Sequence, residues 1–225
     1  IARMREIDPL IRKFLGDKAE IFVEPIFDKP IREYDPLDLG DLLSNVIKRL
    51  SVLISQHRLE HVKSVADLCY KIAAIHNFPA ESAYFCGLLH DCAKGLDNDS
   101  MSDALMRKYY PDYVNHEKWL QHQFLGKVLA EQLFGVMDED ILGGIEFHAS
   151  GKANMTAMQK IVYACDKIDP LRGYDSKYMI VALENDLESG FRLVLSENRL
   201  FYRAKGQTDE NADPLVQECY AYYLH

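Results

Sequence analysis

No stretch of the sequence resembles a membrane span or a signal peptide, because the apolar runs are short and broken by charged residues. The sequence also has no excess of basic residues: 26 Lys and Arg stand against 35 Asp and Glu, a net charge of -9. We therefore expect a protein that binds neither membranes nor nucleic acid. A small anionic ligand is compatible with this charge, because cations held in a site set their own local field.

Cysteine is scarce as well, and its pattern predicts no disulfide or zinc framework. The number of cysteines is odd and no two have C-x-x-C spacing. We expect reduced, mostly buried thiols in a cytoplasmic protein. The five are Cys69, Cys86, Cys92, Cys165 and Cys219.

The length and composition, 225 residues of which 48% are hydrophobic, predict one well-cored domain with an appendage. Residues 1–41 are predicted to be a short, mixed extension. Within it, Met4 to Leu15 has the pattern of a helix, and Ala19 to Phe27 alternates like a strand, with Ile21, Val23 and Ile26 on one side. Three prolines then break the pattern before a boundary near residue 41.

From Leu42 onward the apolar periodicity is helical, which predicts an all-α domain over residues 42–225. Gly135, Gly151 and Pro170 stand where helices are expected to stop. The expected helices cover residues 42–54, 62–73, 80–89, 101–109, 119–134, 138–147, 154–168, 179–197 and 214–224.

Six chemistry-bearing side chains fall on the apolar faces of five of these helices. A lone histidine in such a position is usually an ordinary core residue, but a buried carboxylate costs several kcal/mol unless cations or donors face it. Adjacent helix positions point about 100° apart, so His90 and Asp91 can reach two sides of one metal centre. The six predicted metal ligands are His61, His90, Asp91, His122, His148 and Asp166.

Imidazoles and carboxylates without thiolates suit iron, manganese, cobalt, nickel or zinc. Six ligands are too many for one four-coordinate zinc with an open position. We therefore predict two cations that share the Asp91 carboxylate. Such a pair generates hydroxide near neutral pH and holds a phosphoryl group for in-line displacement.

The order of these ligands resembles that of the HD-domain superfamily of metal-dependent phosphohydrolases. Four local spellings are similar to its YqeK branch, the bacterial symmetrical diadenosine tetraphosphate hydrolases: HRLEHVKSVADLC, CGLLHDCAKGL, FHASGKANMTAMQKIVYACDKIDPLRGYD and ALENDLESGFRLVLSENRLFYRAKG. The resemblance covers about residues 42–225. It implies an all-helical domain, a di-iron centre, and hydrolysis of diadenosine tetraphosphate to two ADP by a water that the metal pair activates.

All six ligand positions of the family pattern are filled, which implies that His61, His90, Asp91 and Asp166 hold one cation, and Asp91, His122 and His148 the other. Two departures stand out. WLQHQFLGKVLA around His122 replaces a small, Gly-rich stretch, and residues 1–40 have no counterpart in the hydrolase domain. Those residues resemble at most the tail of a fused nicotinate-nucleotide adenylyltransferase, and they carry no nucleotide-binding motif.

A transferring phosphoryl group needs positive charge around its oxygens, so Lys94 and Arg172 are the predicted catalytic phosphate contacts beside Asp91, with Arg58 as a further substrate contact. For each of these three cations the alternative interpretation is a surface ion pair. Tyr174 or Tyr84 is the candidate to stack on adenine. The rival functions are another HD-type phosphohydrolase, acting on a mononucleotide or cyclic nucleotide, and a non-catalytic nucleotide-binding module. A homodimer is left open.

Overall fold

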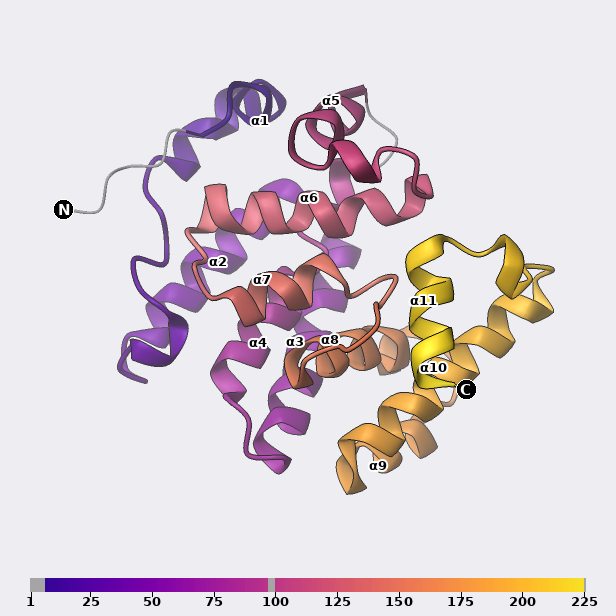
Figure 1. Ribbon diagram of the computed structural model, residues 1–225. Coiled ribbons are helices and arrows are strands. Elements are labelled where there is room, and N and C mark those ends of the chain that lie inside the picture. Colours follow the sequence, from indigo (N-terminus) through magenta and orange to yellow (C-terminus); the bar gives the residue numbers. More distant parts are fainter. Residues whose placement is uncertain (1–6, 97–99, 225) are drawn as a thin grey trace.

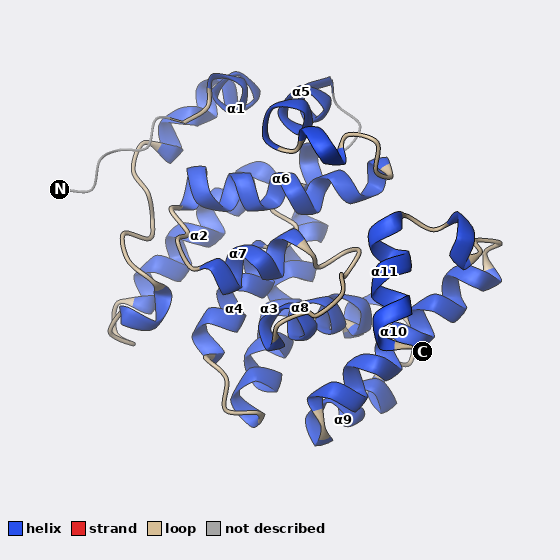
Figure 2. Cartoon of the chain, viewed as in Figure 1, coloured by secondary structure: helices blue, strands red, loops and turns tan. Residues whose placement is uncertain are grey.

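The computed structural model describes residues 7–96 and 100–224, and each regular element in these ranges is helical (Figure 2). The predicted all-α fold class is therefore confirmed. The N-terminal part holds α1 (Pro9–Leu15), 3-10 helices at Gly16–Phe22 and Ile31–Glu33, and α2 (Leu39–Leu53). Within the described ranges, no helix combines the length and the apolar character that a membrane crossing requires.

The centre of the molecule is built from α3 (Gln56–Ile75), α4 (Ala80–Leu89) and α8 (Ala157–Ile168), which pack on one another. Two helices, α6 (Gln121–Leu129) and α7 (Glu139–Glu146), contact each other and lie over this centre, with α5 (Ser100–Tyr109) beside α6 (Figure 1). The last three, α9 (Lys177–Asn185), α10 (Leu187–Ala204) and α11 (Pro214–Tyr223), form a group at one side, orange to yellow in Figure 1.

Local sequence explains where the central helices begin and end. The Ser55 side chain accepts the Arg58 N–H at the start of α3, and Thr156 forms a capping box with Gln159 at the start of α8. After α6 the chain continues as one π-helical turn, Ala130–Phe134, which stops at Gly135 with φ +82. These caps satisfy backbone groups that a helix end would otherwise leave unpaired.

Close approach of α3 and α4 brings the predicted ligands of both helices into one core. A Cβ at Gly87 would lie 2.9 Å from the Ala66 Cα, so only glycine fits at this contact. The approach places the end of α4, where His90 and Asp91 stand, against the first turns of α3.

The strand predicted for Ala19–Phe27 is wrong. The chain there forms a 3-10 helix over Gly16–Phe22, and the described residues offer no neighbouring strand with which it could pair. The alternation was also misleading, because Val23 is 54% exposed while Phe22 and Phe27 are buried. The predicted helix is present over Pro9–Leu15, and residues 4–6 lie outside the described ranges.

The single helix predicted for residues 179–197 is also wrong, because α9 ends at Asn185 and α10 begins at Leu187. Asp186 between them has an extended backbone, and its carboxylate accepts the Ser189 N–H at 2.8 Å as the N-cap of α10. The two helices cross closely, since a Cβ at Gly190 would lie 2.5 Å from the Leu183 backbone.

The N-terminal segment packs into the same hydrophobic core as the helices that follow it. Arg49 of α2 donates to the Leu133 carbonyl and, at 2.5 Å, to the Glu24 carbonyl, and its guanidinium lies over the Phe22 ring. Asp8 accepts the Leu10 N–H and pairs with Lys108 of α5. Since α2 begins at Leu39, residue 41 lies in its first turn; the division at residue 41 stays a prediction.

Candidate metal centre

The structure brings all six predicted ligands together in the interior. His61 comes from α3, His122 from α6 and Asp166 from α8, whereas His90 is the C-cap of α4 with Asp91 directly after it. His148 follows two residues after the end of α7. Each of the six is at most 6% exposed. Five helices therefore deliver their ligands to one point.

In all four histidines, Nδ1 faces an oxygen atom that can only accept a hydrogen bond. For His90 and His148 this places the proton on Nδ1 and directs the lone pair of Nε2 into the cluster, which is the tautomer a metal ligand needs. His122 Nδ1 also lies 3.1 Å from Lys94 Nζ, and His61 Nε2 lies 3.2 Å from Asp166 Oδ1, so at these two histidines a bound cation would select the same tautomer. The pairs are His61 with Asp169 Oδ2 at 2.6 Å, His90 with Gly87 O at 2.6 Å, His122 with Trp119 O at 2.7 Å and His148 with Ile145 O at 2.8 Å.

Two overlapping groups of ligand atoms each lie close enough to hold a cation: His61, His90 and Asp166 in one, and His90, Asp91 and His148 in the other. Because both groups use His90, which can bind only one ion, a second ion would need the remaining ligands on its side of the cluster. Asp91 stands between the two sides of the cluster. Its Oδ1 lies 3.3 Å from His122 Nε2 and 3.5 Å from His148 Nε2, while its Oδ2 lies 3.7 Å from His90 Nε2. This is the arrangement that a bridging carboxylate requires.

The donor set fits a metal centre better than a hydrogen-bonded core. His122 Nε2 and His148 Nε2 lie 3.1 Å apart, and with both Nδ1 atoms protonated two lone pairs face each other. His90 Nε2 is fully buried and has no hydrogen-bond partner among the described residues. A buried acceptor without a donor is unfavourable, and a cation satisfies these nitrogens at once.

The electrostatics differ across the cluster. Burial disfavours the charged form of His61, but hydrogen bonds with Asp166 and Asp169 outweigh it and raise the pKa of His61 to about 8. For His148, burial dominates over the nearby Asp91 carboxylate and lowers its pKa to about 3. Burial also opposes ionisation of Asp166, yet Lys167 and Arg172 hold the pKa of this carboxyl well below its usual range.

Four of the six predicted ligands, Asp91, His122, His148 and Asp166, line a cleft with a volume of about 520 Å³. All three predicted substrate contacts line this cleft. Arg58 Nη1 lies 2.8 Å from Asp91 Oδ2, Arg172 pairs with Asp166, and Lys94 Nζ lies 3.1 Å from His122 Nδ1. The cleft therefore combines buried anions at its base with cations around them.

A family model described as "HD domain" matches residues 58–171. The chain belongs to the HD-domain family. The matched range contains all six ligands of the cluster and ends just before Arg172. The HD resemblance read from the sequence is thereby confirmed, while the part of each residue in the chemistry stays a prediction.

Curated relatives and a solved structure resemble this HD-domain chain. A Bacillus subtilis protein named symmetrical bis(5'-nucleosyl)-tetraphosphatase is 28% identical over 68% of the chain and 84% of its own length. A Mycoplasma genitalium protein named probable nicotinate-nucleotide adenylyltransferase/Ap4A hydrolase is 22% identical, and the match spans only 53% of its length. A predicted HD superfamily hydrolase involved in NAD metabolism from Clostridium acetobutylicum superposes with a TM-score of 0.71 at 26% identity, covering 81% of this chain and 96% of that one.

Several contacts around the HD site were not predicted from the sequence. Asp169 accepts a hydrogen bond from His61 Nδ1 at 2.6 Å. Of the two tyrosines considered for base stacking, Tyr174 lines the cleft, but Tyr84 lines a separate surface groove. Trp119, the sole tryptophan, also lines the cleft and was not among the predicted site residues, although it stands three residues before His122.

Proposed function

We propose that this HD domain hydrolyses diadenosine tetraphosphate symmetrically, giving two ADP. The observation that carries the proposal is the convergence of four buried imidazoles and two buried carboxylates, four of these six groups lining a cleft that cations also line. The name of the Bacillus subtilis relative supports the choice of substrate. The broader assignment, an HD-type nucleotide phosphohydrolase, is supported by the site and the family match without the name of any relative.

His61, His90, Asp91 and Asp166 would hold one metal ion, and Asp91, His122 and His148 the other; we propose iron for both positions. When bound, such a pair supplies a water of lowered pKa and positive charge toward the phosphoryl oxygens. Asp169 and the backbone carbonyls behind the other histidines hold the ring orientations, which favours metal binding.

The cationic side chains of the cleft would bind the polyphosphate. Arg58 and Arg172 are partly exposed, with 31% and 37% of their side chains accessible, so each can contact a ligand carboxylate and a phosphate oxygen at the same time. Lys94 adds a third cation near His122. These residues orient the chain of phosphates and offset its charge, which increases as the scissile bond breaks.

Symmetrical cleavage also suits the groups that the cleft contains. The leaving group is ADP, whose terminal phosphate needs little protonation as it departs. The reaction therefore does not need a strong general acid beside the scissile bond. Four of the cleft's imidazole and carboxylate side chains, Asp91, His122, His148 and Asp166, already belong to the ligand set.

A substrate panel tests the proposal. Metal-loaded protein should turn over diadenosine tetraphosphate faster than mononucleotides or cyclic nucleotides, and Asp91→Asn should abolish turnover. His57→Ala is the control, because this histidine of α3 is exposed whereas the six ligands are buried, and it should leave the rate unchanged. Preferred turnover of a mononucleotide would replace the proposed substrate, and no turnover of any nucleotide would favour a binding module.

A further inference from the structure

The cleft above the metal centre has two chemically different halves. The ligands and the cations Arg58 and Lys94 come from the HD-matched range, residues 58–171. The aromatic side chains lie almost entirely outside that range, on α9 and α10 and the turn before them. They are Tyr174, Tyr178, Phe201 and Tyr202, joined by Trp119 from the 3-10 turn Lys118–Leu120.

Trp119 connects the aromatic half to the metal centre. Its backbone carbonyl accepts the His122 Nδ1–H at 2.7 Å, and its indole ring faces Tyr202 of α10, with ring centroids 6.2 Å apart and planes 28° from parallel. Both rings are only half-buried and line the cleft. A nucleotide whose phosphates lie over the metal centre would bring its planar base to this pair of rings. Stacking on aromatic rings is favourable for every base.

Asn198, one turn before Tyr202 on α10, supplies the polar group that aromatic rings lack. Its amide nitrogen donates to the Tyr163 hydroxyl at 3.1 Å, and the Tyr163 ring is fully buried and cannot move away. Within the described residues, the Asn198 carbonyl oxygen has no hydrogen-bond partner. In this orientation the amide presents an acceptor to a ligand, and a 6-amino purine carries a matching donor.

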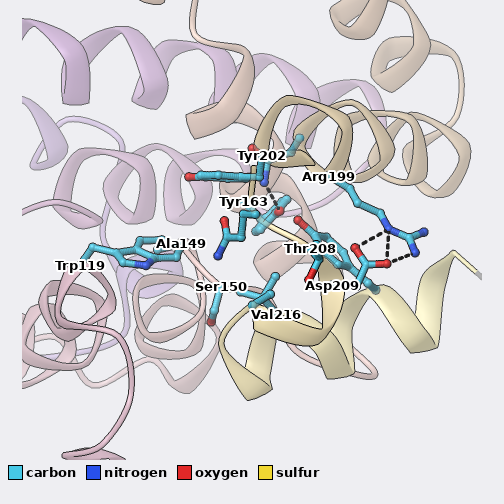
Figure 3. A pocket seen from close by; sticks show the side chains of 13 residues that line it. Trp119, Ala149, Ser150, Tyr163, Arg199, Tyr202, Thr208, Asp209 and Val216 are labelled. Atoms are coloured by element: carbon cyan, nitrogen blue, oxygen red, sulfur yellow. Dashed lines mark hydrogen bonds and ion pairs between the residues drawn. The ribbon is translucent and has the colours of Figure 1, made fainter. Parts of the chain in front are cut away.

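A second, tighter cavity lies behind these residues, shown in Figure 3 between Trp119 at one end and the Arg199–Asp209 pair at the other. Its volume is about 10 Å³, room for a single water. Trp119, Asn198 and Tyr202 line both cavities. A base can therefore bind only on the side of the metal centre, against these three residues.

We infer that Trp119, Tyr202 and Asn198 form a purine subsite that selects a 6-amino base and thereby fixes one adenosine of the substrate; this rests on the function proposed above for the same cleft. Selection by base would thus come largely from the C-terminal helices, whereas the phosphate chemistry comes from the HD-matched residues.

The single tryptophan makes the subsite directly observable, because all indole fluorescence of the metal-loaded protein comes from Trp119. ADP should quench this emission on binding, and inorganic pyrophosphate, which has no base, should leave it unchanged. Inosine diphosphate, with an acceptor in place of the 6-amino group, should bind about tenfold more weakly than ADP, as expected for one lost hydrogen bond. Equal quenching by pyrophosphate and ADP would overturn the subsite.

Variants separate the roles of the three residues. Asn198→Ala should remove the preference for ADP over inosine diphosphate, and Tyr202→Leu should weaken both by about tenfold. Asn185→Ala, the same change at an exposed position of α9, should alter neither. A preference that survives Asn198→Ala, or a preference for the inosine form, would overturn the assignment of Asn198. ADP binding without turnover of the dinucleotide would count against the proposed function alone.

Discussion

Asp169 should control metal affinity without touching the metal. Its carboxylate is fully buried, accepts the His61 Nδ1–H at 2.6 Å, and is held by the Ser64 hydroxyl at 2.6 Å and the Leu171 N–H at 3.2 Å. Asp169→Asn keeps the shape but removes the charge and introduces an N–H₂ group. If that group faces His61, the ring changes tautomer and its Nε2 lone pair no longer faces the cluster.

Removing such an outer partner of a ligating histidine typically lowers metal affinity by about 10- to 100-fold, or about 1.4–2.8 kcal/mol. An opposing effect must be separated, because loss of the Asp169 charge also lowers the pKa of His61 and reduces competition from protons. We therefore propose metal titration calorimetry well above pH 8, where wild-type His61 is already neutral and only ring orientation matters.

Asp67→Asn is the matched control, since it removes a carboxylate from the exposed face of the same helix as His61 and should leave metal affinity unchanged. Unaltered metal affinity in Asp169→Asn would refute the view that this carboxylate sets the His61 tautomer. An equal loss in both variants would mean that only the overall charge matters.

Three further predictions concern the bridge, the phosphate contacts and the packing. Elemental analysis should find that Asp91→Ala loses both ions while His148→Ala keeps one, and equal loss in the two would contradict a bridging carboxylate. Lys94→Ala should retain its metal but lose about 10²- to 10³-fold in kcat. Unchanged kinetics would mean that this lysine has no part in catalysis. In denaturant unfolding, Gly87→Ala should destabilise by about 1–3 kcal/mol because its Cβ would lie 2.9 Å from the backbone of α3; Gly40→Ala, with open space around it, should not.

The metal cluster was predictable from the sequence because its residues break the apolar pattern of their helices. A carboxylate such as Asp166 within an otherwise buried stripe demands a compensating charge whatever the fold. The tautomers of the four histidines could not be predicted from the sequence. They depend on backbone carbonyls one turn earlier, as at Ile145 behind His148, and on Asp169, which meets His61 only after α3 and α8 pack.

The two wrong elements have different causes, one the lack of a tertiary partner and the other a local cap. Alternation around Val23 resembled a strand, but no strand among the described residues lies alongside it. Continuous periodicity hid the break at Asp186, although an aspartate three residues before Ser189 is a recognisable cap. Of the aromatic half of the cleft only Tyr174 was predicted, because Trp119 and Tyr202 are 83 positions apart and meet only in the folded chain.

The central claim, symmetrical hydrolysis at this centre, is tested most directly by running the reaction of metal-loaded protein with diadenosine tetraphosphate in heavy-oxygen water. One water is consumed for each bond broken, so the account predicts ADP as the only nucleotide product, with one heavy oxygen per pair of ADP molecules, on a terminal phosphate. AMP together with ATP would contradict it, because the anhydride bond broken would then be an outer one and not the central one.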